Sequence, residues 1–127
     1  MQQKHLYEYA VVRVVPVVER EEFVNAGVIL FSKKEKFLRM QYHLHEDKIL
    51  ALMPQADLDE IRKNLEAFRK VAAAEPDGGP IACMDEAERF RWLTAVRSAS
   101  IQTSRPHPGV CDDLEKTINS LFSELVG

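Results

Sequence analysis

The first third of the chain carries the hydrophobic pattern of β-strands. Residues 7–15 (YEYAVVRVV), 23–32 (FVNAGVILFS) and 37–43 (FLRMQYH) are rich in the β-branched and aromatic side chains that fit a pleated surface. Pro16 lacks the amide hydrogen that a central strand must donate, so the first strand is expected to end there. Because only short links separate the three strands, they predict an antiparallel meander that opens with a β-hairpin.

Strict alternation of side chains assigns the second strand to two faces. One face is expected to carry Phe23, Asn25, Gly27, Ile29 and Phe31. The other is expected to carry Val24, Ala26, Val28 and Leu30. Asn25, and Arg13 in the first strand, are polar residues within otherwise apolar strands.

The apolar spacing changes to that of helices after the third strand. Residues 47–53 predict a short helix that is stopped by Pro54. Asp57 and Glu60 form a capping pattern, which satisfies the free amides at a helix start. An apolar stripe at spacings of three and four follows this cap: Leu58, Ile61, Leu65, Phe68 and Ala72.

The second half of the chain predicts two more helices. One covers residues 85–96, and the other follows a second capping pattern formed by Asp112 and Glu115. Residues 98–103 could form a fourth short strand, which the sequence leaves undecided. Two segments rich in proline and glycine, residues 75–80 and 105–109, are expected to be loops. Strands first and helices later predict an α+β fold, in which an antiparallel meander of three strands, or four, packs with three to four helices in a single domain over residues 1–127.

Composition narrows the class of protein. The chain has 127 residues, of which 46% are hydrophobic and 29% charged, as expected for one globular domain. The net charge is −3 and the two signs are interspersed, so bulk charge does not indicate a nucleic-acid-binding face. We expect a cytoplasmic protein with reduced thiols at Cys83 and Cys111, because no secretory leader and no membrane-spanning apolar run are recognisable.

The polar residues of the hairpin form the most unusual cluster in the sequence. Arg13 and Asn25 interrupt apolar strands, and Glu22 lies near them if the strands pair. One interpretation is an internal network in which Arg13 pairs with Glu22, while Asn25 and Gly27 accommodate a bulge. The other is a pocket in which Arg13 holds an anion or carboxylate and Glu22 acts as acid or base. The network is the simpler expectation, because a buried arginine needs a partner.

Other motifs carry little chemistry. His43 and His45 would point the same way on a strand, but no third ligand follows at recognisable spacing, so no metal site and no cofactor are predicted. Phosphate-binding glycine loops and nucleophile motifs are missing from the sequence, and no catalytic residue is assigned. The hydroxyl-rich segment from Ser100 to Arg105, after Arg97, suits either a solvated sheet edge or a binding groove.

The hairpin resembles the opening of a bacterial family known as domain of unknown function 3037. That opening combines an aromatic strand ending in R-x-x-P with an E-x-x-N-x-G-V segment. The matching residues are Tyr9, Arg13, Pro16, Arg20, Glu22, Asn25, Gly27 and Val28. Residues 97–105 and the terminal LFSELV also resemble the family, whereas Glu21 stands where glycine is expected, which suggests a less tight turn. The resemblance implies no activity, but it implies that members occur beside kinases similar to the HipA toxin type.

Three functions stay open from the sequence. The first is a non-catalytic binding or accessory module that recognises a protein partner, with a HipA-like kinase as a candidate. The second is a small enzyme or ligand-binding domain that uses the hairpin pocket. The third, nucleic-acid binding, needs a local arginine groove. The candidate binding residues are Arg13, Arg20, Glu22, Asn25, Arg97, Ser100 and Arg105. The oligomeric state is not predicted.

Overall fold

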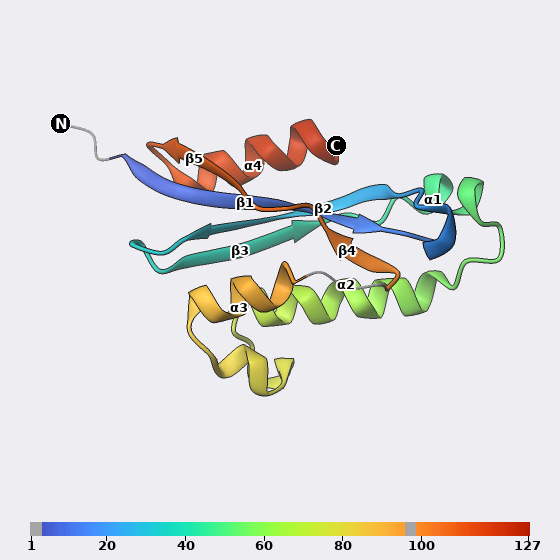
Figure 1. Ribbon diagram of the computed structural model, residues 1–127, viewed down its shortest axis with the longest axis horizontal. Coiled ribbons are helices and arrows are strands. Elements are labelled where there is room, and N and C mark those ends of the chain that lie inside the picture. Colours follow the sequence, from blue (N-terminus) through green and yellow to red (C-terminus); the bar gives the residue numbers. More distant parts are fainter. Residues whose placement is uncertain (1–3, 96–98) are drawn as a thin grey trace.

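The chain folds around one antiparallel sheet of five strands. The computed structural model describes residues 4–95 and 99–127. The strands are β1 (His5–Val14), β2 (Val24–Ser32), β3 (Phe37–Tyr42), β4 (Ile101–Thr103) and β5 (His107–Cys111). Their order is β3-β2-β1-β4, and β5 also pairs with β1 (Figure 1). The predicted meander of the first three strands is confirmed, and β4 is the fourth strand that the sequence left open.

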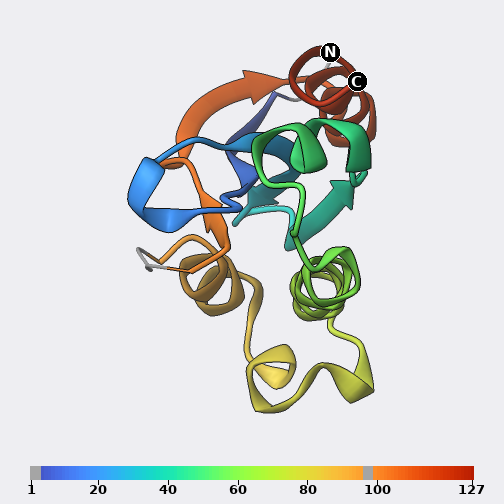
Figure 2. The same ribbon diagram turned by 90° about the vertical axis from the view of Figure 1, so that its right-hand side faces the viewer.

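Helices cover both faces of this sheet. They are α1 (Glu46–Leu52), α2 (Leu58–Ala72), α3 (Glu86–Leu93) and α4 (Leu114–Leu125). Figure 2 shows α2 (green) and α3 (yellow) nearly end-on beneath the sheet, while α4 (red) lies above it. The predicted α+β class, with four helices, is therefore confirmed. Within residues 4–95 and 99–127, no helix has the length and apolar character needed to cross a bilayer.

Two separate cores hold the layers together. Between the sheet and α2 and α3, Ile29 packs with Leu65 and Leu93, all of them fully buried. On the other face, Val28 and Leu30 pack against α4. Because β2 is buried on both sides, its sequence reads as a nearly continuous apolar run.

A β-bulge changes which face the first part of β2 presents. Val12 of β1 pairs with Gly27, but the next residue, Arg13, pairs with Asn25, so Ala26 is the extra residue. Strict alternation was therefore wrong, since Val24 and Ala26 lie in the same core as Ile29 and Phe31. The bulge places Asn25 on the α4 face.

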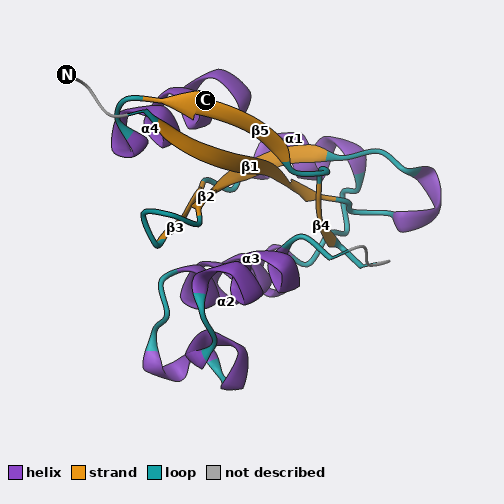
Figure 3. Cartoon of the chain, turned by 60° about the vertical axis from the view of Figure 1, so that its left-hand side comes forward, coloured by secondary structure: helices purple, strands orange, loops and turns teal. Residues whose placement is uncertain are grey.

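Strand β5 was predicted as a loop, and this prediction was wrong. Its five residues pair with the first half of β1, while β4 pairs with the end of β1 (Figure 3). Pro108 is tolerated because β5 is an edge strand, where a missing amide hydrogen can face away from the ladder. Ser104 joins the two short strands, as its Oγ accepts from the Val11 amide at 2.9 Å and its own amide donates to the Val11 carbonyl at 2.9 Å.

Helix caps agree with the sequence patterns except in one case. The Asp57 side chain accepts from the Glu60 amide at the start of α2, as predicted. At α4 the cap is Asp113, which accepts from the Lys116 amide, and Asp112 lies outside it. The predicted position was wrong by one residue because the Asp-x-x-Glu pattern selects Asp112, whereas the adjacent Asp113, which has Lys116 three residues later, forms the cap.

Arg89 is a buried side chain whose role the sequence did not indicate. It is 4% exposed and donates to the carbonyls of Val71 and Ala72 at the end of α2. Its Nε also donates to the Met84 carbonyl, and its other end pairs with Glu86. Arg89 therefore ties the last turn of α2 to the start of α3.

Candidate functional site

A row of polar side chains crosses the sheet just beyond the end of α4. Arg13 on the central strand β1 has Gln102 of β4 on one side and Asn25 of β2 on the other. Residues directly opposite one another on neighbouring strands share a face. The Nδ2 atom of Asn25 donates to the Leu125 carbonyl at 3.2 Å, which identifies this face as the one that carries α4. We call Gln102, Arg13 and Asn25 the polar row.

Two buried atoms of the polar row lack hydrogen-bond partners. Within the part of the chain that the structure describes, these atoms are Arg13 Nε and Asn25 Oδ1. The guanidinium carbon of Arg13 lies 4.3 Å from the centre of the Phe23 ring, and Phe23 is 47% exposed. An unsatisfied buried polar group costs about 1–3 kcal/mol. The polar row is therefore the place where the fold carries polar groups that it does not use itself.

The predicted pair between Arg13 and Glu22 does not form. Glu22 instead pairs with Arg20 at 2.5 Å, and both side chains are well exposed. The link between β1 and β2 is a short 3₁₀ helix (Val18–Arg20) that ends at Glu21 with φ of 55°, in the left-handed region that favours glycine. This turn brings the Arg20 and Glu22 side chains together, and it leaves Phe23 beside Arg13.

A small cavity adjoins the polar row. Its volume is about 230 Å³, and it is lined by Phe23, Val24, Asn25, Lys48, Leu125 and Val126. The last carbonyls of α4 border it, but both are already occupied. Asn25 donates to the Leu125 carbonyl, and His45 Nε2 lies 2.7 Å from the Val126 carbonyl. The polar side chains that line this cavity are those of Asn25 and Lys48. Arg13 is not a lining residue, but it lies opposite Asn25 on β1 and over the ring of Phe23.

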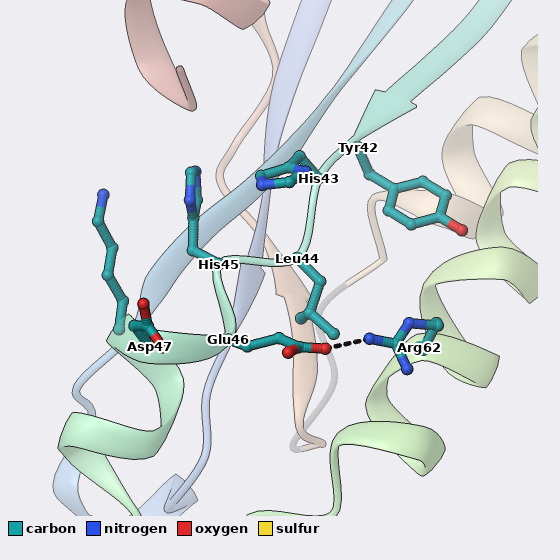
Figure 4. Close-up of a pocket in the computed structure, with 8 residues that line it drawn as sticks. Tyr42, His43, Leu44, His45, Glu46, Asp47 and Arg62 are labelled. Atoms are coloured by element: carbon teal, nitrogen blue, oxygen red, sulfur yellow. Dashed lines mark hydrogen bonds and ion pairs between the residues drawn. The ribbon is translucent and has the colours of Figure 1, made fainter.

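A larger open hollow lies next to it, where β3 leads into α1. Figure 4 shows its lining, with an ion pair between Glu46 and Arg62 on one side and the rings of His43 and His45 on the other. The hollow is about 770 Å³. The two imidazoles meet edge to face at 4.6 Å between ring centres. Among the described residues, no three His, Cys, Asp or Glu side chains are arranged to hold a metal ion.

Tyr42 forms a fixed wall of this hollow. Its hydroxyl donates to Glu66 at 2.6 Å, and Glu66 also accepts from Arg69 Nε at 2.8 Å. The hydrogen bonds from Arg69 and then Tyr42 hold the pKa of Glu66 down at about 2. Burial, followed by the bond to Glu66, raises the pKa of Tyr42. Both pKa shifts show that the contacts favour a charged Glu66 carboxylate and a neutral Tyr42 phenol. The pair therefore has a structural role and exchanges no proton near neutral pH.

The remaining candidate residues do not join the polar row. Ser100 contributes its carbonyl, which accepts from the Val15 amide at 2.7 Å, so it belongs to the sheet ladder. Arg105 is exposed after β4, and Arg97 lies outside the described residues. The structure thus brings together Arg13 and Asn25 of the predicted set.

Sequence reasoning missed four parts of this site. Gln102 enters through the pairing of β4 with β1, and Lys48 and the end of α4 enter through tertiary packing. Phe23 was assigned only to a strand, but it directly precedes Val24, which pairs with Val14, and this place near Arg13 across the hairpin is a signal that cross-strand counting can use. For Lys48 no local signal exists.

Comparison with known proteins gives one match. A family model described as "Protein of unknown function (DUF3037)" matches residues 9–126. No curated protein and no solved structure matches the chain. The match contains the whole polar row and the end of α4.

Proposed function

We propose that this chain, which belongs to the DUF3037 family of proteins of unknown function, is a non-catalytic module that binds an extended segment of a protein partner. The segment lies over the polar row and beside Phe23. The observation that carries the proposal is the pair of unpartnered buried atoms on neighbouring strands, Arg13 Nε and Asn25 Oδ1.

These two atoms ask for opposite hydrogen-bonding groups. Arg13 Nε–H is a donor and needs an acceptor, while Asn25 Oδ1 is an acceptor and needs a donor. A peptide chain presents both groups at every residue, as carbonyl and amide. Buried polar groups in folded proteins are nearly always satisfied, so a bound segment that supplies both is a physical reason to keep them. Because both atoms are buried, the segment must displace the side chains that cover them.

Phe23 supports the same use. An exposed aromatic ring stacked under an arginine combines the two residue types that dominate binding energy at protein interfaces. The ring and the guanidinium provide a contact surface of low conformational entropy, because each restrains the other. This supports binding through side-chain contacts as well as through main-chain hydrogen bonds.

The two alternative functions have less support at this site. The enzyme or ligand-binding alternative needs Glu22 as acid or base, but Glu22 is paired with Arg20. That pair also removes Arg20 from an arginine groove for nucleic acid. The family resemblance makes a HipA-like kinase the first partner to test.

Site-specific photo-crosslinking tests the proposal. The photoreactive residue p-benzoylphenylalanine replaces Phe23 in one variant and Met84 in a control, which is 43% exposed beside α3 on the opposite side of the sheet. Each variant is irradiated with the purified HipA-like kinase and, separately, inside cells that contain the native partners. We expect one discrete adduct from position 23 and none from position 84.

The adduct must also depend on the polar row. Adding Asn25→Leu to the position-23 variant removes the acceptor and is expected to abolish the adduct. No adduct from position 23, equal adducts from both positions, or an adduct unaffected by Asn25→Leu would each overturn the proposal.

A further inference from the structure

We infer that the bound segment presents a carboxylate to Arg13, so that the partner is recognised through an acidic residue. This inference rests on the proposed function and names the chemistry of the segment at the same site. It follows from the state of Arg13, from the charges around the cavity and from the space beside Phe23.

Arg13 differs from five other arginines of the chain, because it has no acidic partner within residues 4–95 and 99–127. Five arginines each pair with a glutamate, namely Arg20, Arg39, Arg62, Arg69 and Arg89. Arg13 is half-buried, and among the described residues it has the Phe23 ring but no carboxylate. A guanidinium that is partly removed from water gains most from an anionic partner.

The buried Nε of Arg13 favours a particular approach. A carboxylate can bind a guanidinium side-on, with one oxygen accepting from Nε–H and the other from a neighbouring Nη–H. Such a pair would satisfy the buried Nε that the fold leaves without a partner. A single carbonyl oxygen can accept from both donors, but it carries no charge, so the stronger charge-assisted pair favours a carboxylate.

The surroundings are suited to negative charge. Lys48 lines the same cavity, and no described carboxylate forms an ion pair with it. The nearest glutamate on the hairpin, Glu22, is occupied by Arg20. The carbonyls at the end of α4, which would repel an anion, accept from Asn25 or contact His45.

The cavity adjoins Arg13 through Phe23 and Asn25, and it provides room for part of the bound segment. At about 230 Å³ it is far larger than the space that one water molecule needs. Asn25 Oδ1 at its edge then accepts from a backbone amide of the segment, so the carboxylate and the main chain use different groups of the polar row.

Selection from a library of random dodecapeptides displayed on phage tests the inference on the intact chain. We expect the enriched peptides to share one Asp or Glu. Replacing that residue by Asn or Gln in a synthetic peptide should weaken binding about tenfold or more, since a charge-assisted bidentate pair is lost. This comparison needs no change in the protein.

A protein variant then assigns the carboxylate to Arg13. Arg13→Gln should bind the acidic peptide about tenfold more weakly and should no longer distinguish it from its amide form. The matched control is Arg91→Gln, at an exposed position on α3, which should bind as the parent does. Retained discrimination in Arg13→Gln would overturn the inference.

Failure of the inference and failure of the proposed function give different results. If the enriched peptides lack a common acidic residue, yet their binding is lost in Asn25→Leu and Phe23→Ala, the carboxylate is wrong and the binding module stands. If no peptide is enriched, or if binding is indifferent to Phe23 and Asn25, the proposed function fails and the inference fails with it.

Discussion

Replacing Arg13 by methionine separates a structural role of the hairpin arginine from a binding role. Methionine keeps the unbranched aliphatic part of the side chain, but it removes the guanidinium that stacks on Phe23, the charge and all five N–H donors. If Arg13 holds the hairpin as part of an internal network, its loss should be costly. If Arg13 is retained for a partner, the isolated chain should tolerate the change.

The structure sets the expected magnitude. Removing the buried and unpartnered Nε should raise the free energy of unfolding by about 1–3 kcal/mol. Losing the stacking of the guanidinium on Phe23, 4.3 Å away, costs about 0.5–1 kcal/mol. The free energy of unfolding should therefore rise, by up to about 2 kcal/mol. Breaking a buried ion pair, by contrast, would lower it by about 3–5 kcal/mol.

Urea unfolding followed by circular dichroism measures the difference, because the midpoint moves with stability while the slope reports the surface exposed. The matched control is Arg39→Met, since Arg39 also lies over an aromatic ring, that of Phe37 at 4.9 Å, but pairs with Glu115. The control should lose up to about 2 kcal/mol, because it gives up both an exposed ion pair and the stacking on Phe37. A loss of more than about 2 kcal/mol in Arg13→Met would refute the reasoning and assign Arg13 to the hairpin network.

Four further substitutions, with one control, test the fold and its pH dependence. Arg89→Met should lower the free energy of unfolding by about 3–5 kcal/mol, because buried carbonyls lose their donor; Arg91→Met on the same helix should change it by less than about 0.5 kcal/mol, and equal effects in urea would contradict this. The pKa of Glu66 is lowered from 4.5 to about 2, so its contribution is present above pH 4.5 and lost as the pH falls toward 2. Because the Glu66 side chain is 35% exposed, solvent screening reduces its contribution to the free energy of unfolding to roughly 1 kcal/mol. Glu66→Gln should therefore lose less stability than the parent protein between pH 7 and pH 3, and equal losses would contradict this prediction. Glu21 and Ala74 have φ of 55° and 56°, in the left-handed region that strains residues other than glycine. Glu21→Gly and Ala74→Gly should therefore each raise the free energy of unfolding by about 0.5–1 kcal/mol and raise the melting temperature. An unchanged melting temperature would show that the backbone is not strained there.

Elements that depend on neighbouring residues could be predicted from the sequence. The cap at Asp57 and the stripe that follows it require only spacings along one helix, and α2 begins where they indicate. Strand β5 was missed because a proline argues against a strand, and only the sheet order shows that Pro108 stands at an edge. The cap of α4 was misplaced because the spacing rule selects Asp112, with Glu115 three residues later, whereas an aspartate can cap a helix without that glutamate, as Asp113 does.

At the candidate site, too, the sequence predicted what depends on neighbouring residues and missed what depends on tertiary packing. Arg13 and Asn25 could be identified because polar residues inside apolar strands need a reason. The partner of Glu22 was wrong because the backbone of the turn, with its left-handed Glu21, decides which arginine the carboxylate reaches. Lys48 comes from a helix that no local pattern connects to the hairpin.

The bulge in β2 connects the fold to the proposed binding surface. Without the extra residue Ala26, alternation would turn Asn25 toward the core beneath α2 and α3, where an amide would face apolar side chains. With it, Asn25 lies opposite Arg13 and caps the end of α4, while Ala26 fills the core. A bulge interrupts the ladder and costs pairing, so a hairpin selected for stability alone would favour regular strands. The bulge is explained if its purpose is to place Asn25 on the α4 face, beside Arg13. The proposed binding of an acidic segment requires Asn25 at this position.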